Sequence, residues 1–419
     1  MFNHLKYPCP LLNLIIIVLP IAPLLANNPQ NTESWADDME LVWESVTQSF
    51  PMTELQEKEW SSIRKRSLRK AKRIRSEIEF VELTNNVFDQ MGVSHFKLYG
   101  TQNQILRPQT NDHVSTKGHL GFEIRWIDGK WYVDGLDEHH QAYDEGIRNG
   151  DQLISVNAQK LISKIENSSE MILASQPRYL FGQIGNAAKV SFKTDNGKKR
   201  TIELDYVKWS GIWTKPIGNF PSLPAKLNVV EIENITVIRF DLFSFDFMQS
   251  IVQAIKNSHD RDGIIFDLRG NRGGLGFMAN GIVGHMSNDS FRMGTMYMKE
   301  GTINFHVFPQ HNPYLGKVAV IIDRWSASTT EIFASGIQES GRGKVFGETS
   351  MGAALPSKFS KLPNGMVLQQ AIATLVSANG RSIENEGVVP DYPIEMTKQD
   401  LIQGNDPLLS AALEWIKGR

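Results

Sequence analysis

The stretch "DRWSASTTEIFASG" (residues 323–336) places two serines, Ser326 and Ser328, between a buried strand and a helix. It follows the apolar run "GKVAVII", and the residues after Ser328 have helical periodicity. A serine in this position either caps the helix or acts as the nucleophile of a hydrolase. Because a hydroxyl is a weak nucleophile, the second interpretation requires a base elsewhere in the chain.

A second stretch, "IIFDLRGNRGGLGF" (264–277), runs from a buried strand into a glycine-rich loop. Glycines there let backbone N–H groups approach an oxyanion without a Cβ in between. A loop that binds nucleotide phosphates is the competing interpretation. The spacing fits neither the dinucleotide fingerprint nor the P-loop, and no Gly-Lys-Ser/Thr follows. Alone, the loop does not decide the chemistry.

Taken together, "DLRGNRGG" and "DRWSASTTEIFASGIQESGRGKVFGETSMG" resemble the C-terminal processing (tail-specific) serine peptidases. The resemblance implies that Ser328 is the nucleophile and that Ser326 is a cap or turn serine. It also implies an oxyanion hole formed by the N–H of Thr329 and that of Gly273 or Gly274. The helix that begins at Ser328 would point its positive end at the developing charge.

The base separates two branches of this family. In the best-known branch it is a lysine in a Gly-Lys-Gly turn, but here the turn reads "TSMGAALPS" and Ala353 occupies that position. Alanine accepts no proton, so the chain is either inactive or uses another base. Lys358 is a candidate substitute, although the pattern places it in the next strand facing solvent.

The other branch resembles the core of tricorn protease and uses a histidine. Its Ser-His pair occurs here in "MGVSHFKLYG" as Ser94 and His95, and its glutamate segment occurs in "GRSIENEGVVPDY" as Glu384. The resemblance therefore implies a catalytic tetrad of Ser328, His95, Ser94 and Glu384. A histidine suits the role of base because its ordinary pKa lies near working pH. Glu386 lies close enough in sequence to compete with Glu384.

Three regions must position these residues. Residues 31–109, which carry the Ser-His pair, have apolar residues at helical spacing, with a stripe that runs to Ile78 beneath a basic face. We expect that face to be solvated rather than to bind nucleic acid. In residues 114–207 the hydrophobic period changes to two, which predicts short strands. Residues 228–419 alternate predicted strands with predicted helices. The sequence predicts a helical domain, a β-rich domain and an α/β core, which the resemblance implies is crotonase/ClpP-like.

The β-rich region resembles a PDZ domain through "AYDEGIRNGDQLISVNAQKL" (142–161), with its Ala-x-x-x-Gly, Gly-Asp and Val-Asn elements. The resemblance implies that the "HLGF" loop holds the terminal carboxylate of a peptide that adds to a sheet edge. The loop consists of His119, Leu120, Gly121 and Phe122. The alternative is a PDZ-like fold that binds nothing and acts as a spacer.

Composition narrows the remaining classes of function. The 419 residues are 41% hydrophobic and 21% charged, and the net charge of −2 gives no attraction to nucleic acid. The run "LLNLIIIVLPIAPLL" after Lys6 predicts a cleaved signal peptide over residues 1–26 rather than a stable membrane span. We therefore expect a periplasmic or secreted protein. Cys9, the only cysteine, precedes the apolar run, so the mature chain would have no disulfide or thiol chemistry.

The sequence thus predicts an exported serine endopeptidase for unfolded or tail-exposed proteins, able to form a homo-oligomer. It predicts no cofactor, and no metal because the histidines lack carboxylates at ligand spacing. Two alternatives remain open. One is a pseudoenzyme that binds peptides through its PDZ domain, and the other is a carrier of hydrophobic ligands on the same core.

Overall fold

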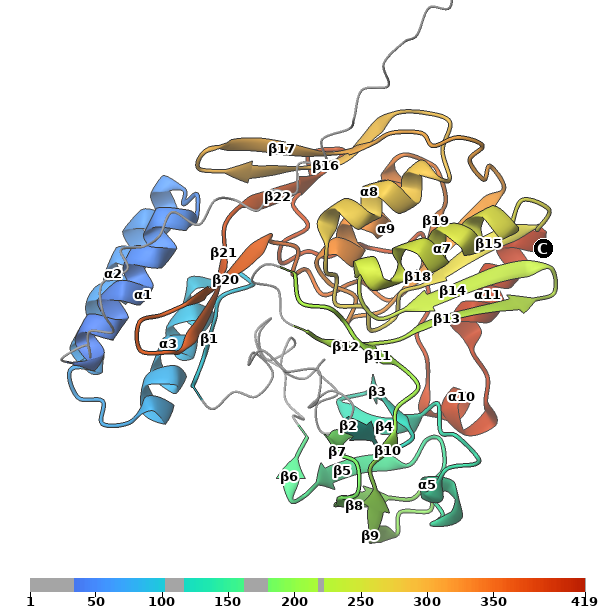
Figure 1. The fold of residues 1–419 in the computed structure, drawn as a ribbon, viewed down its shortest axis with the longest axis horizontal. Helices are drawn as coiled ribbons and strands as arrows, with labels where there is room; N and C mark the ends of the chain where they lie inside the picture. The colour runs from blue at the N-terminus through green and yellow to red at the C-terminus, as the bar shows by residue number, and fades with distance from the viewer. Residues whose placement is uncertain (1–33, 102–116, 162–179, 218–221, 419) are drawn as a thin grey trace, which may run out of the picture.

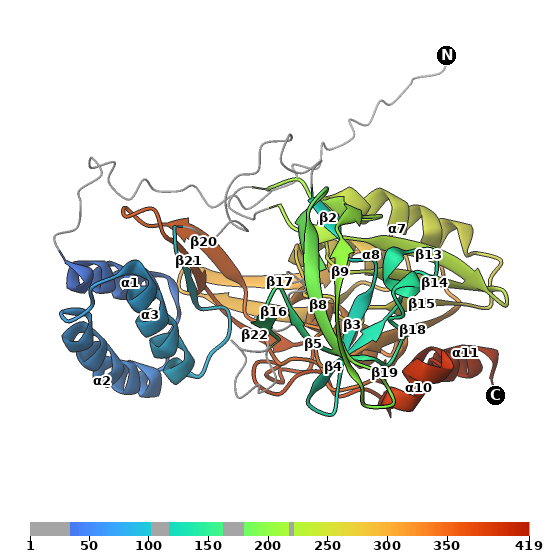
Figure 2. The ribbon, with the colours of Figure 1, turned by 90° about the horizontal axis from the view of Figure 1, so that it is seen from below.

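The computed structural model describes residues 34–101, 117–161, 180–217 and 222–418, and the predicted signal peptide lies outside them. The chain is a mixed α/β protein with a helical part, a β-rich part and an α/β part (Figure 1). Figure 2 shows the N-terminal helices at one end of the molecule and the C-terminal helices at the opposite end. Within the described residues, no helix combines the length and the hydropathy needed to cross a bilayer.

The helical part packs three helices around buried aromatic side chains such as Trp43 and Phe88. They are α1 (Trp35–Ser49), α2 (Glu54–Ala71) and α3 (Glu77–Met91), and serine or threonine caps each first turn. Gly92 ends α3 with a left-handed φ of 69°, which turns the chain toward the α/β part. The apolar stripe is shorter than predicted, because Ile78 is 72% exposed.

The short strand β1 (Lys97–Tyr99) connects this helical part to residues more than 260 positions later. It pairs antiparallel with β21 (Val367–Ala371), which in turn pairs with β20 (Ser357–Lys361). Leu98 and Leu368 face each other in the first pair, and both belong to the buried core of the helical part. This pairing carries the preceding Ser-His turn to the C-terminal half of the chain.

The β-rich part contains a six-stranded sheet. Five strands follow the order β3-β4-β5-β8-β9, the sixth, β6, pairs with β5, and β3 lies at one edge. A smaller sheet has the order β10-β2-β7. The helix α5 (Gln141–Asp144) lies between β4 and β5 in the chain. The strands are β2 (Lys117–His119), β3 (Glu123–Ile127), β4 (Lys130–Asp134), β5 (Gln152–Val156), β6 (Gln159–Lys160), β7 (Phe181–Gln183), β8 (Ala187–Lys193), β9 (Lys199–Asp205) and β10 (Val207–Lys208).

The α/β part is built on a second six-stranded sheet, in the order β13-β14-β15-β18-β19-β23. Only β13 runs antiparallel to its neighbour, and the other neighbouring strands are parallel. A pair of short strands, β11 (Ile212–Trp213) and β12 (Pro224–Ala225), precedes this sheet in the chain. The strands of the sheet are β13 (Leu227–Ile232), β14 (Ile235–Phe240), β15 (Gly263–Asp267), β18 (Lys317–Ile322), β19 (Lys344–Gly347) and β23 (Tyr392–Pro393).

Alternate residues of these strands serve two different cores, as the two-residue period of a strand requires. Phe266 and Val320 pack in one core with helices α7 (Phe245–Asn257), α8 (Gly276–Gly284) and α9 (Thr329–Glu339). Their neighbours Ile265 and Ile321 pack with α10 (Lys398–Gln403) and α11 (Pro407–Lys417) on the other face. The sheet is therefore buried on both faces, and its loops meet at the carboxyl ends of the strands.

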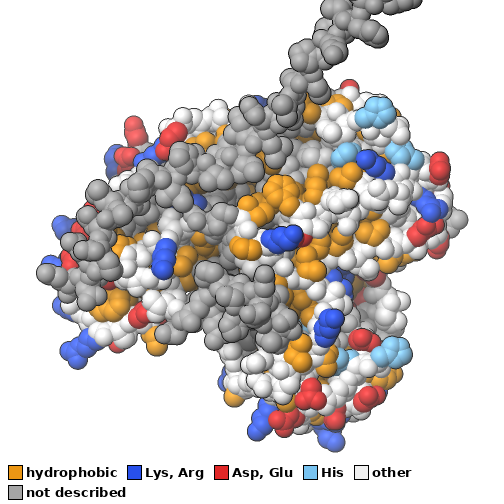
Figure 3. All heavy atoms as spheres, in the orientation of Figure 1, with side chains coloured by type: hydrophobic (Ala, Val, Ile, Leu, Met, Phe, Trp, Pro, Cys, Tyr) orange, Lys and Arg blue, Asp and Glu red, His pale blue; other side chains and the backbone are white. Residues whose placement is uncertain are grey.

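A three-stranded sheet completes this part, with β16 (Phe291–Met298) between β17 (Gly301–Val307) and β22 (Thr374–Ser377). Exposed apolar side chains lie on α7 and α8, notably Phe245 and Phe277, which are each about half exposed. Hydrophobic side chains gather over these helices in the middle of the face drawn in Figure 3.

Candidate active site

Ser328 lies at the turn between β18 and α9, where the strand feeds the first turn of the helix. Its backbone has φ 58° and ψ −121°, a conformation that a residue with a Cβ rarely adopts and that stores strain. Its N–H donates to Ala353 O and to Glu331 Oε2, each at 2.9 Å. The surroundings thus hold a strained turn in place and leave the side chain of Ser328 half-buried rather than enclosed.

Ser326, the other serine of this stretch, is fully buried, and its hydroxyl both donates and accepts hydrogen bonds. Its Oγ donates to Leu268 O at 2.8 Å and accepts from the N–H of Asp323 at 3.0 Å. Such a hydroxyl stabilises the turn and cannot reach a substrate. The geometry agrees with the turn role that the sequence assigned to Ser326.

Gly273 touches Ser328 directly. A Cβ on this glycine would lie 2.6 Å from the Cβ of Ser328 and 2.8 Å from the nitrogen of Thr329, and its φ is +90°. Only glycine fits in so close an approach. The glycine-rich loop and the first turn of α9 therefore form one continuous surface around Ser328.

The N–H groups of this surface differ in what they already bond. Gly273 N–H donates to Asn271 Oδ1 at 2.9 Å, so it is not available to an oxyanion. Among the described residues, the N–H groups of Gly274 and Thr329 make no hydrogen bond, and Thr329 Oγ1 joins the two residues by donating to Gly274 O at 2.9 Å. Of the two glycines that the sequence left open, Gly274 has the free donor and Gly273 supplies the space.

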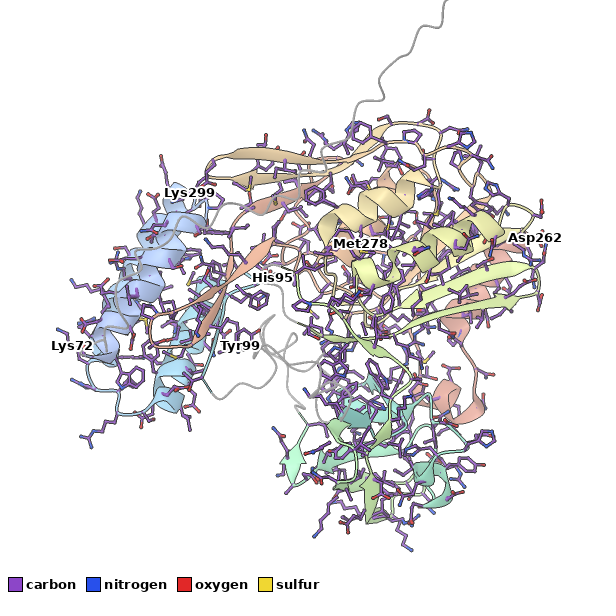
Figure 4. The ribbon with its side chains drawn as sticks, viewed as in Figure 1. Lys72, His95, Tyr99, Asp262, Met278 and Lys299 are labelled. Carbon is purple, nitrogen blue, oxygen red and sulfur yellow. The ribbon has the colours of Figure 1, made fainter. Side chains whose placement is uncertain are left out.

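Ser94, His95 and Glu384 are also brought together. Ser94 Oγ lies 2.7 Å from Nδ1 of His95 and donates to Glu384 Oε2 at 3.0 Å, while Ser94 N–H donates to Glu384 Oε1 at 2.6 Å. His95 itself has a left-handed φ of 62°, just before β1 begins. In Figure 4 His95 lies between the helical part and the α/β part. The label of Met278, a residue of α8, marks the α/β part.

These contacts define the state of the imidazole. With Glu384 ionised, the single proton of the Ser94 hydroxyl goes to the carboxylate, so Ser94 Oγ must accept from Nδ1–H of His95. Nε2 is then the unprotonated nitrogen. Burial lowers the pKa of His95 to about 4, which keeps the ring neutral at pH 7. A neutral ring with a free Nε2 lone pair can act as a base.

One short segment joins this trio to Ser328. Ala353 O accepts from Ser328 N–H, and the next residue, Ala354, donates its N–H to Glu384 Oε2 at 3.1 Å. His95 Nε2 has no hydrogen bond to Ser328 Oγ or to any other group in the described part of the chain. The nucleophile and the imidazole thus share one hydrogen-bonded frame but are not hydrogen-bonded to each other in this structure.

Glu331 is a buried carboxylate that the sequence interpretation missed. It accepts from the N–H of Ser328, Gly352 and Ala353, and from Ser350 Oγ at 2.6 Å. Burial raises its pKa to about 7. The pattern Ser-x-x-Glu, which marks a capping box, was the signal in the sequence that pointed to it.

The other candidates lie outside this arrangement. Glu386 is exposed, whereas Glu384 is partly buried and burial raises its pKa. Lys358 lies in β20, and partial burial lowers its pKa. No cluster of three or more His, Cys, Asp or Glu side chains suited to a metal ion occurs in the residues that the structure describes.

The "HLGF" loop precedes the edge strand β3, with the side chains of Leu120 and Phe122 buried. Leu120 N–H already donates to Leu180 O at 3.1 Å, and Gly121 N–H donates to His119 Nδ1 at 3.2 Å. Two of the amides assigned to a peptide carboxylate are therefore occupied within the protein. The N–H of Phe122 makes no hydrogen bond with the described residues.

Comparison with known proteins finds similarity to peptidases over a region that includes Ser328 and Glu384. Residues 234–394 match the family model of Peptidase family S41. The chain is 21% identical over 390 residues to the carboxyl-terminal-processing protease of Picosynechococcus sp., with 90% of this chain and 87% of that protein covered. It is 22% identical to the carboxy-terminal processing protease CtpB of Bacillus subtilis, over 66% of this chain and 55% of that protein. It is 25% identical to the tricorn protease of Thermoplasma acidophilum, over 57% of this chain and 22% of that protein.

Solved structures share the fold at low sequence identity. The photosystem II D1 C-terminal processing protease superposes with a TM-score of 0.59 and 17% identity, over 88% of this chain and 96% of that chain. Mature CPAF superposes with a TM-score of 0.61 and 11% identity, over 92% and 99% of the two chains. The tricorn protease gives a TM-score of 0.52 and 18% identity, over 92% of this chain and 37% of that chain.

Proposed function

We propose that the chain is a serine endopeptidase of the S41 type, with Ser328 as nucleophile and His95 as general base. The observation that carries the proposal is the frame of hydrogen bonds that runs from Ser328 through Ala353 and Ala354 to Glu384, Ser94 and His95. The similarity to carboxyl-terminal-processing proteases supports the reaction class. Ala353 at the position of the family's lysine supports a histidine base over a lysine one.

In the proposed reaction, Ser328 Oγ attacks the carbonyl carbon of the scissile peptide bond and its proton passes to His95 Nε2. This transfer requires the two atoms to come within about 2.6–3.2 Å of each other. The carbonyl oxygen becomes an oxyanion that accepts from the N–H groups of Gly274 and Thr329. His95 then protonates the leaving amine, and water hydrolyses the acyl-serine ester by the reverse sequence of proton transfers.

Ser94 and Glu384 stabilise the charged form of the base. When His95 takes up its second proton, Nδ1–H donates to Ser94 Oγ, which donates to the Glu384 carboxylate. The negative charge of Glu384 is thereby coupled to the imidazolium through one hydroxyl. Because burial disfavours the imidazolium, this coupling lowers the free energy of the state that follows proton transfer.

We further propose that the β-rich part is a PDZ-like domain inserted before a crotonase/ClpP-like core. The position of β3 at the end of its sheet, beside the "HLGF" loop, supports this, because an extended peptide can add to a sheet edge as a strand. The substrates would be unfolded or tail-exposed proteins. The predicted signal peptide makes the periplasm or the exterior the proposed location.

The direct test is labelling with a serine-directed phosphonate probe, combined with casein cleavage. We expect the probe to modify Ser328, and we expect Ser328→Ala and His95→Ala each to reduce cleavage by roughly 10⁴-fold or more. Lys358→Ala should remain active. Activity lost in Lys358→Ala but kept in His95→Ala would make the lysine the base.

The same experiment separates the two alternatives. A peptide-binding pseudoenzyme would not react with the probe, yet it would bind peptides. A carrier would purify with bound lipid and would leave casein intact. Either result would overturn the peptidase proposal.

A further inference from the structure

A strongly basic surface lies along α2 and its C-cap, outside the candidate active site. Residues 64–75 contain eight Lys and Arg and no Asp or Glu, so the rest of the chain carries a net charge of −10, the total being −2. The near-neutral total therefore hides a local positive charge that can act on a partner. Six of these residues are here called the basic face: Lys65, Arg66, Arg69, Lys70, Lys72 and Arg73.

The basic face is one side of a helix. Positions 65, 69 and 72, and likewise positions 66, 70 and 73, recur at three- and four-residue spacing, which brings their side chains side by side. The opposite side carries Trp60, Ile63, Ser67 and Ala71, which are buried in the helical part. All six residues of the basic face are exposed. The C-terminal half of α2 thus has a buried side and a solvent side whose charges are all positive.

The protein itself does not neutralise these charges. No residue of the basic face forms an ion pair within the described residues, whereas Arg64 beside them pairs with Glu40. The side chains of Arg66 and Arg69 make hydrogen bonds only to Ser62 Oγ and to a carbonyl oxygen of α2. Like charges at this spacing repel one another and destabilise a helix. A helix that needed only solubility would mix acids with bases here, so the arrangement favours an anionic partner.

An exposed apolar residue favours a bilayer as that partner over a nucleic acid. Ile78 lies in the first turn of α3 and is 72% exposed. Only residues 72–76 join α2 to α3, so Ile78 lies at the end of the helical part where the basic face ends. An apolar side chain beside Lys and Arg suits the interface of a bilayer, whereas nucleic acid attracts a basic surface through its phosphates alone.

The basic face also lies away from the candidate active site. In Figure 4 Lys72 lies at the outer edge of the helical part, and His95 lies on the inner side of that part. Figure 2 shows the helical part at one end of the molecule. A flat surface can therefore meet the basic face without covering His95.

We propose that the basic face, together with Ile78, binds the surface of a bilayer that contains anionic phospholipids. About four to eight Lys and Arg on one helix are typical of segments that bind such lipids. The cationic side chains attract the phosphate head groups, and the apolar side chain enters the interface between head groups and acyl chains. The protein lies on the surface and does not span it. This binding is independent of the proposed peptidase function.

Binding is tested by co-sedimentation with vesicles. The protein is the chain from Asn27 onward, because the apolar run before it could enter a bilayer by itself. The vesicles contain phosphatidylcholine alone or with about 30% phosphatidylglycerol. We expect the anionic vesicles to bind the protein about ten-fold or more tightly at about 0.05 M NaCl. That preference should largely disappear at about 0.5 M, because salt screens the attraction.

Two triple variants locate the contact. The first removes three charges of the basic face by Arg69→Gln, Lys72→Gln and Arg73→Gln, and it should weaken binding to anionic vesicles by about ten-fold or more. The matched control removes three exposed lysines of β8 and β9 by Lys189→Gln, Lys193→Gln and Lys199→Gln, and it should bind like the parent. Glutamine is a good helix former, so the first variant should keep the melting temperature of the parent.

Ile78→Ser measures the apolar contribution. It should weaken binding to anionic vesicles several-fold and leave the salt dependence unchanged, since burial of an apolar group involves no charge. An affinity equal to that of the parent would refute the role of Ile78. Equal binding to neutral and anionic vesicles, or equal weakening in the two triple variants, would refute the proposal as a whole. Binding to a duplex DNA fragment without binding to anionic vesicles would assign the basic face to nucleic acid instead.

Discussion

Gly273 lies against Ser328 so closely that a methyl group on the glycine would sit 2.6 Å from the serine Cβ. Gly273→Ala should therefore displace Ser328 or the Thr329 N–H, at a cost of about 1–3 kcal/mol in backbone strain. We expect cleavage of a fluorogenic peptide to fall by about 10²- to 10³-fold, the loss typical of a damaged oxyanion hole. Gly270→Ala is the matched control, because Gly270 also has a positive φ but open space around it.

Substitution of the two serines of the turn should cause different defects, one in stability and the other in cleavage. Ser326→Ala leaves Asp323 N–H without its buried acceptor, so we expect a loss of about 1–3 kcal/mol in the free energy of unfolding. Ser328→Ala should abolish cleavage and leave stability unchanged or slightly higher, since the strained residue loses no bonded side-chain group. Denaturant unfolding and cleavage measured on both variants check this. Cleavage lost in Ser326→Ala at unchanged stability would reassign the nucleophile.

His95 should resist protonation. Burial lowers its pKa from 6.5 to about 4, so the ring should stay neutral as the pH falls through 6 and 5. In an NMR titration of the Ser328→Ala protein, the His95 ring signal, assigned by comparison with His95→Gln, should titrate near pH 4. A midpoint near 6.5 would mean that the ring is hydrated and not held as the structure has it.

Glu384 and Glu386 differ by two positions but should differ widely in effect. Glu384→Gln removes the charge coupled to His95 through Ser94 and should lower kcat by about 10²-fold. Glu386→Gln changes an exposed carboxylate and should be neutral. Steady-state kinetics on both variants provide the comparison, and equal effects would rule out a specific role for Glu384.

Glu331→Gln should disturb the turn that holds Ser328. The carboxylate accepts from three N–H groups and one hydroxyl, and an amide would turn its own NH₂ toward donors. We expect a loss of about 1–3 kcal/mol in stability and a lower kcat with little change in KM. Glu386→Gln, which changes an exposed carboxylate, is the control.

The raised pKa of Glu331 gives this variant a pH signature. Between pH 4.5 and about 7 the native protein holds a proton that the unfolded chain has released, so this group makes the free energy of unfolding decrease as pH rises. Glu331→Gln should flatten that dependence. A dependence of the same slope in wild type and variant would assign it to other groups.

The residues proposed for the site came from the family resemblance, and most of them lie where a helix or strand begins or ends. Ser328 begins a helix after an apolar strand, the glycine loop follows another strand, and Ser94 and His95 follow Gly92 at the end of α3. The alternation of strands and helices predicts the α/β core, and the structure adds that its sheet is buried on both faces.

The sequence could not predict which strands pair when they lie far apart in the chain. It also could not predict which backbone N–H groups are already hydrogen-bonded within the protein. Nothing local in "KLY" indicates that β1 joins β21, and nothing in the glycine loop shows that Asn271 occupies the N–H of Gly273. The periodicity of α3 also misled, since Ile78 continues the apolar stripe in sequence but faces solvent in the first turn. These outcomes depend on tertiary packing.

Ala353 is fully buried, in the same cluster as Trp325, Ala327 and Met351, while its carbonyl holds the N–H of Ser328. A longer side chain there would have to displace these neighbours, and overpacking a filled core costs about 1–3 kcal/mol. A single exchange at Ala353 is therefore not expected to give the protein a working lysine base. Under the proposed histidine mechanism, evolution of a lysine base at this position would first require the packing around one methyl group to be rebuilt.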